Sequence, residues 1–358
     1  MSHLNKLIEA LRRSEADAII VSSEVNQRYL TSFAFTDGYV LVTREKGYLI
    51  TDFRYIEDAK AHCADGFDIL RPEQQGMLML LRELIGDNKT VLLEEATLPI
   101  AEEKRIAAML DTCTVTSGAS AMIDGLRLYK DAEEIEAMKK AQAITDAAFA
   151  HILKVLTPEM TELEAALELE FFMRRMGSEG TAFETIAVSG SASSLPHGHP
   201  RNQKLERGFF TMDFGAKVDG YCSDMTRTVV LGKADEEMKH LYNAVLKAQV
   251  CALDALREGM LCRDADKVAR DIIDFNGYKG RFGHSLGHGV GLYIHESPRL
   301  AAFSPDTMVL SRGHVVTVEP GIYIEGKYGC RIEDMVAVLD DGSIYNFTHS
   351  PKGMIELF

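Results

Sequence analysis

The chain has 358 residues, of which 46% are hydrophobic, and a formal net charge of −15. This length suits two domains with a core each, and the acidic balance argues against nonspecific binding to nucleic acid or to anionic membranes. Six cysteines are scattered without a C-x-x-C pair, which favours reduced thiols over a disulfide framework or a zinc knuckle. The first residues are charged and amphipathic, and no run approaches the length of a membrane span, so we expect a cytoplasmic protein.

The first third alternates between helical spacing of apolar residues and short apolar runs typical of buried strands. The expected strands are residues 18–21, 39–43, 47–52, 67–70, 90–93 and 112–116. This alternation predicts an α/β layer with a parallel or mixed sheet. The pattern breaks at residues 123–127, and we place a domain boundary near Gly125. The N-terminal domain would then be residues 1–125, and the second domain residues 126–358.

Two helices are expected to open the second domain. Residues 131–156 carry an apolar stripe behind an acidic first turn, and residues 161–176 begin with Thr161-Glu162-Leu163-Glu164, a capping-box pattern. A strand over residues 183–190 should lead into the segment LPHGHP, where proline and glycine around His197 and His199 indicate a rigid loop. Two more helices, at residues 237–257 and 263–276, carry no evident site.

Residues 209–232 contain two alternating apolar and polar runs around Asp219-Gly220, which predicts a hairpin with a type I′ turn. In that register Asp213 lies opposite Thr226, and Asp224 becomes the diagonal neighbour of Asp213, with Cβ atoms roughly 7–8 Å apart. This spacing suits two acids that reach a shared pair of cations, which lie about 3.5–4 Å apart in two-metal sites. Two ordinary strand-end aspartates would explain the same pattern.

A glycine-rich segment follows at residues 283–296, GHSLGHGVGLYIHE. Its glycines disfavour a helix and allow close approach of the backbone. His288 and His295 would face opposite sides of a flat strand, so they converge only if the glycines bend the chain. His288 is a candidate metal ligand because neutral imidazole commonly binds divalent ions, whereas His284 and His199 fit hydrogen-bonded loop histidines equally well.

A second hairpin is predicted between residues 314 and 339, where two apolar runs flank a five-residue loop at residues 325–329. Glu319 would then pair with Met335, and Glu333 would be the diagonal neighbour of Glu319, with Pro320 at an edge or bulge. Two acid pairs aimed at one place repel each other unless cations lie between them. Two aspartates, two glutamates and a histidine are ligands that hard-to-borderline divalent ions prefer.

Five separated motifs stand in order along the chain: LPHGHP, MDFGAKVDGYCSDMTRT, GHGVGLYIHESPR, VEPGIYI and RIED. Together they resemble the signatures of the pita-bread metallopeptidases of the M24 group, and within it the chain is most similar to Xaa-Pro dipeptidases (prolidases) and Xaa-Pro aminopeptidases. The first third resembles the creatinase-type N-terminal domain of the same proteins. The resemblance implies an α/β creatinase-like N-terminal domain and an α+β pita-bread catalytic domain, whose pseudo-symmetric antiparallel sheet is flanked by helices.

The resemblance also implies a dinuclear metal site, with manganese as the expected ion and cobalt, zinc and iron as alternatives. Its ligands would be Asp213, Asp224, His288, Glu319 and Glu333, with Asp224 and Glu333 bridging. His197 and His295 would contact the substrate and stabilise the tetrahedral intermediate, and Glu319 would be the general base. Arg299 stands where prolidase-like members place an arginine for the substrate carboxylate.

These expectations describe a homodimeric metallopeptidase that hydrolyses the bond preceding proline, in Xaa-Pro dipeptides or at the N-terminus of longer peptides. Its partner is a proline-containing peptide, not a nucleic acid or a membrane. The alternatives are a metal-free creatinase-like hydrolase, a pseudo-peptidase that only binds, and a methionine aminopeptidase. The metal-free relatives lack the five ligands that this chain keeps, and methionine aminopeptidases normally lack an α/β domain such as residues 1–125.

Overall fold

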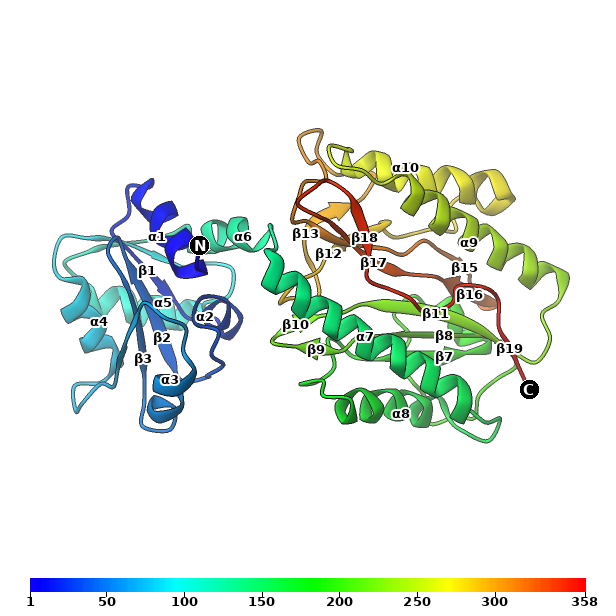
Figure 1. Cartoon of the computed structure of the whole chain (residues 1–358), viewed down its shortest axis with the longest axis horizontal. Helices are drawn as coiled ribbons and strands as arrows, with labels where there is room; N and C mark the ends of the chain where they lie inside the picture. Colours follow the sequence, from blue (N-terminus) through cyan, green and yellow to red (C-terminus); the bar gives the residue numbers. More distant parts are fainter. The chain divides into compact units, whose positions relative to one another are not determined.

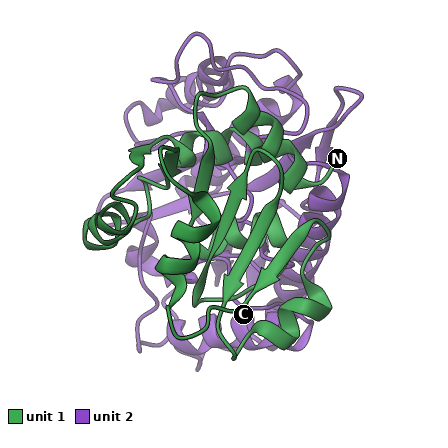
Figure 2. Ribbon diagram, turned by 90° about the vertical axis from the view of Figure 1, so that its left-hand side faces the viewer, with its two compact units in different colours: residues 1–127 green, residues 128–358 purple.

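The computed structural model describes all 358 residues, which form two compact units, residues 1–127 and 128–358 (Figure 2). Gly125, near which we expected the boundary, lies in α6 (Ala119–Arg127), the last helix of the first unit. The predicted break at residues 123–127 is therefore a helix, which the sequence pattern did not indicate. None of the helices in either unit combines the length and the apolar character that crossing a bilayer requires.

The first unit contains a six-stranded mixed sheet in the order β4-β3-β2-β1-β5-β6. Its strands are β1 (Ala18–Val21), β2 (Gly38–Thr43), β3 (Gly47–Thr51), β4 (Phe67–Leu70), β5 (Thr90–Leu93) and β6 (Thr114–Ser117). The pairs β1–β2 and β2–β3 are antiparallel, and the other neighbours are parallel, which confirms the predicted mixed α/β layer.

Helices surround this sheet and bury its apolar side chains. Besides α6 they are α1 (His3–Arg12), α2 (Glu24–Thr31), α3 (Ile56–His62), α4 (Met77–Ile85) and α5 (Ile100–Met109). One acid, Glu94, is fully buried directly after β5. It accepts hydrogen bonds from the backbone and hydroxyl groups of Ser22 and Ser23 and from the amide of Asn26, so it ties the end of β5 to the start of α2.

In the second unit, a pair of helices followed by a largely antiparallel sheet occurs twice (Figure 1). The helices α7 (Ala132–Val155) and α8 (Glu162–Arg175) pack through Phe149 and Leu169 in one core with Phe214 of the first sheet. The helices α9 (Glu236–Ala255) and α10 (Cys262–Ile273) pack in another core with Val316 of the second sheet. The predicted capping box is confirmed, since Thr161 and Glu164 exchange backbone and side-chain hydrogen bonds.

The first of these sheets has the order β19-β11-β8-β7, and the second β13-β12-β14-β17-β18. Their strands are β7 (Ile186–Ser189), β8 (Gly208–Phe214), β11 (Met225–Leu231), β12 (Gly287–Gly289), β13 (Glu296–Leu300), β14 (Val315–Val318), β17 (Asp334–Val338), β18 (Ile344–Asn346) and β19 (Glu356–Leu357). Only the β11–β19 pair of the first sheet is parallel.

The register of the first predicted hairpin is confirmed. Its tip pairs β9 (Lys217–Val218) with β10 (Tyr221–Cys222), and Asp213 lies opposite Thr226. Asp219 and Gly220 have φ angles of 51° and 85°, the positive values that a type I′ turn requires at both central positions. Local turn chemistry therefore fixes the register that brings Asp213 and Asp224 to one side.

The register of the second predicted hairpin is wrong by two residues. Ile324, the last residue of β15 (Gly321–Ile324), pairs with Tyr328, the first of β16 (Tyr328–Arg331), so the loop has three residues instead of five. Gly326 takes a left-handed conformation with φ 68°, which lets the shorter turn close. Because Val318 pairs with Asp334, the next positions, Glu319 and Glu333, face each other directly instead of diagonally.

Candidate active site

A cavity of about 330 Å³ opens in the second unit. Its lining includes every residue that the sequence predicted for the site: His197, Asp213, Asp224, His288, His295, Arg299, Glu319 and Glu333. These residues come from segments that span more than a hundred positions of the chain. The structure thus brings the whole predicted set to one place.

Acidic side chains form the base of this cavity. Asp213 lies near the end of β8, Asp224 directly before β11 and Glu333 directly before β17, and all three are buried. One ligand atom each of Asp224, His288 and Glu333 lie within 4.8 Å of one another. Strands of both sheets therefore position acidic side chains close together at the base of the cavity.

The imidazole of His288 lies among these acids. Its Nδ1 is 3.0 Å from the carbonyl oxygen of Gly289, and because a carbonyl only accepts, Nδ1 carries the hydrogen. Burial lowers the pKa of His288 to about 4, so the ring is neutral at pH 7. The bare Nε2 then lies 3.6 Å from a carboxylate oxygen of Asp224 and 3.4 Å from one of Glu319, an arrangement that repels unless a cation lies between them.

The raised pKa values of the acids also indicate a site for cations. Burial and the charges of neighbouring acids raise the pKa of Asp224 and of Glu333 well above the ordinary range, and burial raises the pKa of Glu319 to about 8. Oδ1 of Asp213 is buried without a hydrogen-bond partner. Carboxylate oxygens that lack donors, together with a neutral imidazole, are the ligand set that suits divalent cations.

Arg331 is a buried cation beside these acids that we did not single out from the sequence. Its guanidinium donates to Oδ2 of Asp213 at 2.6 Å, to the hydroxyl of Tyr323 at 2.8 Å and to the hydroxyl of Thr226 at 2.9 Å. The Thr226 hydroxyl in turn donates to Glu333 at 2.6 Å. The available signal was a charged residue in the RIED motif, two positions before Glu333, on an otherwise apolar hairpin strand.

Basic side chains form the exposed rim of the cavity, namely His197, His295 and Arg299. The rings of His288 and His295 are 4.4 Å apart between centroids, so the glycine-rich segment does bend, as their convergence requires. A Cβ atom on Gly289 would lie 2.1 Å from the carbonyl oxygen of Ser297, which explains glycine at this close approach. Burial and the charge of Arg299 lower the pKa of His295.

Of the two histidines left open, His284 lines the cavity directly. Its Nε2 is 3.0 Å from the hydroxyl of Tyr323, and its Nδ1 is 2.9 Å from the carbonyl oxygen of Ser285. His199 lies at the exposed rim, with Nδ1 3.2 Å from Glu184. No pattern in the sequence separates the two histidines, because their difference in burial arises from packing.

Comparisons with known proteins agree with this architecture. Residues 136–340 match the family model of metallopeptidase family M24, and residues 3–129 match that of the creatinase/prolidase N-terminal domain. An uncharacterized peptidase of Bacillus subtilis, YqhT, is 38% identical over 99% of each chain. Among solved structures, an Xaa-Pro dipeptidase from Bacillus anthracis is 39% identical over 99% of each chain with a TM-score of 0.92. An X-Pro aminopeptidase from Thermotoga maritima is 34% identical over 98% of this chain and 100% of its own, with a TM-score of 0.91.

These similarities extend over both units, and they confirm the predicted fold, a creatinase-like α/β part followed by an α+β pita-bread part. The motifs, the fold and the family models lead to the same assignment. The chain is an enzyme that belongs to metallopeptidase family M24.

Proposed function

We propose that this enzyme hydrolyses the peptide bond preceding proline, with water activated by two divalent cations. The observation that carries the proposal is the group of four carboxylates and one neutral imidazole around a single cavity, with fewer donors than their oxygens need. Similarity over nearly the full chain to an Xaa-Pro dipeptidase and an X-Pro aminopeptidase supports the choice of substrate.

The proposed ligands are Asp213, Asp224, His288, Glu319 and Glu333. Asp224 and Glu333 precede strands of different sheets and meet at the base of the cavity, and the family resemblance gives them the bridging role. Bound cations would lower the pKa of a water molecule and polarise the substrate carbonyl. Manganese is our first choice, and cobalt, zinc and iron suit the same oxygen-rich set.

The chain's own groups would handle the protons. The bond before proline is a tertiary amide, so its nitrogen must gain a proton as it leaves. Glu319, which lines the cavity, would take a proton from the attacking water and pass it to this nitrogen, as a general base that then acts as an acid. At neutral pH the lowered pKa of His295 favours a neutral ring, which can donate a hydrogen bond to the developing oxyanion, with His197 beside it on the rim.

Arg299 would decide the length of the substrate. In an Xaa-Pro dipeptide the free carboxylate belongs to the proline and would pair with a cation at the rim, whereas a longer peptide has an amide at that position. We therefore propose that Arg299 binds the carboxylate of dipeptides. Arg299→Leu should raise KM for Xaa-Pro dipeptides at least tenfold and leave KM for Xaa-Pro-Xaa amides nearly unchanged. Equal effects on both substrates would contradict this role.

The whole proposal is tested by kcat/KM on Xaa-Pro and Xaa-Pro-Xaa peptides in added Mn²⁺, together with analysis of the bound metal. Glu333→Ala should lose bound metal and activity together, since it removes a shared ligand. Glu133→Ala, which removes an exposed acid on α7, is the matched control and should lose neither. Full turnover by metal-stripped protein would refute the proposed metal requirement. Cleavage of Met-Ala peptides without cleavage of Xaa-Pro peptides would refute the proposed substrate specificity. Light scattering tests the homodimer that the family resemblance implies.

A further inference from the structure

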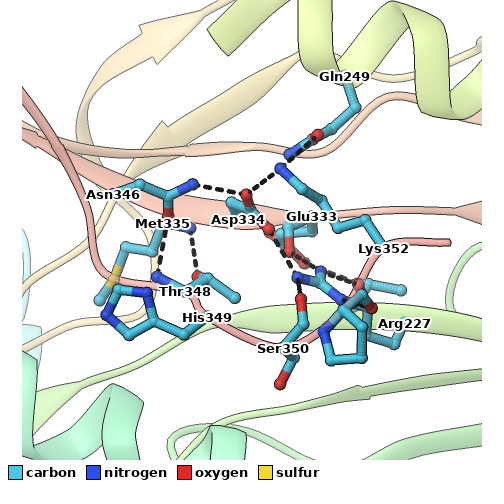
Figure 3. Close-up of polar contacts among 12 residues, drawn as sticks. Arg227, Gln249, Glu333, Asp334, Met335, Asn346, Thr348, His349, Ser350 and Lys352 are labelled. Atoms are coloured by element: carbon cyan, nitrogen blue, oxygen red, sulfur yellow. Dashed lines mark hydrogen bonds and ion pairs between the residues drawn. The ribbon is translucent and has the colours of Figure 1, made fainter.

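A buried charged cluster lies close to the base of the cavity but does not line it (Figure 3). We call it the back network: Arg227, Gln249, Asp334, Asn346, Ser350 and Lys352. Arg227 follows Thr226 on β11, and Asp334 follows Glu333 at the start of β17. Successive side chains of a strand point to opposite faces, so the back network lies on the far side of the strands from the metal centre.

Arg227 uses all of its hydrogen-bonding capacity. A guanidinium has five N–H donors. Its acceptors are the carbonyl oxygens of Thr226 at 2.9 Å, Glu333 at 2.6 Å, Ser350 at 2.9 Å and Pro351 at 3.2 Å, and the carboxylate of Asp334 at 2.8 Å. A single nitrogen, Nη1, thus donates both to the carbonyl of Thr226 on β11 and to that of Glu333, directly before β17.

Asp334 is fully buried and forms an ion pair with Arg227. Its second carboxylate oxygen accepts from Asn346 and from Lys352, each at 2.7 Å, and Lys352 also donates to Gln249 of α9 at 3.1 Å. Figure 3 shows Asn346 of β18 and Lys352 of the C-terminal segment converging on Asp334 of β17, with Gln249 of α9 beside Lys352.

The C-terminal segment is itself fixed in place. Asp146 of α7 accepts from the backbone N–H groups of His349 and Ser350 at 3.0 and 2.9 Å, and from the Ser350 hydroxyl at 2.5 Å. The back network therefore joins α7, α9, β11, β17 and the C-terminal segment. A cluster of this extent can hold the two sheets in one relative position.

Stability alone is a weak reason for such a cluster, because a well-packed apolar pair often replaces a buried ion pair without loss. Geometry is a stronger reason. The strands β11 and β17 belong to different sheets, and they meet where the backbone N–H of Glu333 donates to the carbonyl of Thr226 at 3.1 Å. Arg227 donates to the carbonyls of those same two residues, of which Glu333 is itself a proposed ligand and Thr226 lies two positions after Asp224.

We propose that Arg227 and Asp334, supported by Lys352, are positioning residues for the metal centre. They hold β11 and β17 at the separation at which the carboxylates of Asp224 and Glu333 reach the same cations. This inference rests on the proposed function, since it concerns the cations that the function requires.

The test is the affinity of the full-length protein for Mn²⁺ alone, measured by calorimetric titration. Asp334→Asn keeps the shape of the side chain and removes its charge, and it should raise the Kd for Mn²⁺ by about 10–100-fold, as loss of a residue supporting the ligands does. Lys352→Met is the milder variant and decides the outcome if Asp334→Asn does not fold. It should raise the Kd less, and Lys352→Arg should restore it.

Glu94→Gln is the matched control, because Glu94 and Asp334 are both fully buried carboxylates and the chemical change is the same. It lies in the first unit and should leave the Kd for Mn²⁺ unchanged. Unchanged affinity in folded Asp334→Asn and Lys352→Met, or an equal loss in Glu94→Gln, would overturn the inference alone. A wild-type protein that binds none of Mn²⁺, Co²⁺, Zn²⁺ and Fe²⁺ would overturn the proposed function as well.

Discussion

Buried acids occur in both units, but their surroundings differ. Glu94 in the first unit accepts hydrogen bonds from five donors on three residues. Glu333 in the second unit accepts one from Thr226 and faces other acids, and its burial together with the charges of those acids raises its pKa. A buried carboxylate surrounded by donors is satisfied by the fold itself, whereas carboxylates that face one another require cations. Comparing the two environments therefore separates a structural acid from a proposed metal ligand.

The largest expected effect is on the proposed general base. Glu319→Gln keeps the shape of the side chain but removes its ability to accept a proton, so kcat on an Xaa-Pro dipeptide should fall about 10²–10⁴-fold. Steady-state kinetics in saturating Mn²⁺ measures it, with bound metal determined on the same samples. If the variant retains more than a tenth of wild-type kcat, Glu319 is not the general base.

A smaller effect is expected at the structural acid. Glu94→Gln replaces an acceptor of five bonds with an amide whose NH₂ group faces donors, so the free energy of unfolding should fall by about 1–3 kcal/mol. Urea denaturation measures the change. Activity per folded molecule should stay at the wild-type level, and a loss of activity without a loss of stability would contradict the comparison.

Glu333→Gln should change stability in the opposite direction when no metal is present. Neutralising one of several mutually repelling carboxylates relieves repulsion in the folded state, so metal-free Glu333→Gln should resist urea better than metal-free wild type. In saturating Mn²⁺ the order should reverse, because the wild type alone gains the full binding energy of the ions. Destabilisation of the metal-free variant, as in Glu94→Gln, would show that Glu333 is a structural acid too.

The smallest expected effect concerns a buried base. His314 accepts a hydrogen bond from the backbone of Ser311, and burial together with the charge of Lys130 lowers its pKa to about 4 from an ordinary 6.5. Between these pH values the unfolded chain binds a proton that the folded chain does not, so stability falls as the pH drops from 6.5 toward 4. His314→Phe should reduce the loss of stability between pH 7 and pH 5, and an unchanged loss would contradict the assignment.

The two hairpins show when local sequence is enough to predict the register of paired strands. The register around Asp219-Gly220 could be predicted, because two residues with positive φ define the turn by themselves. The register around Gly326 could not, because the same glycine is compatible with loops of three or five residues, and the prediction was wrong by two positions. The acids Glu319 and Glu333 still reached the cavity, because a shift of two residues keeps a side chain on the same face.

The sequence by itself determined most of the helices and strands, though not α6, together with the first hairpin, the capping box at Thr161 and the family motifs, because these depend on residue types at short spacing. Tertiary structure decided which polar groups meet. Arg331 reaches Asp213 across 118 positions and Arg227 reaches Asp334 across 107, so no local pattern predicts either contact. It also decided which acids find donors, because burial and hydrogen-bond partners exist only once distant strands are packed together.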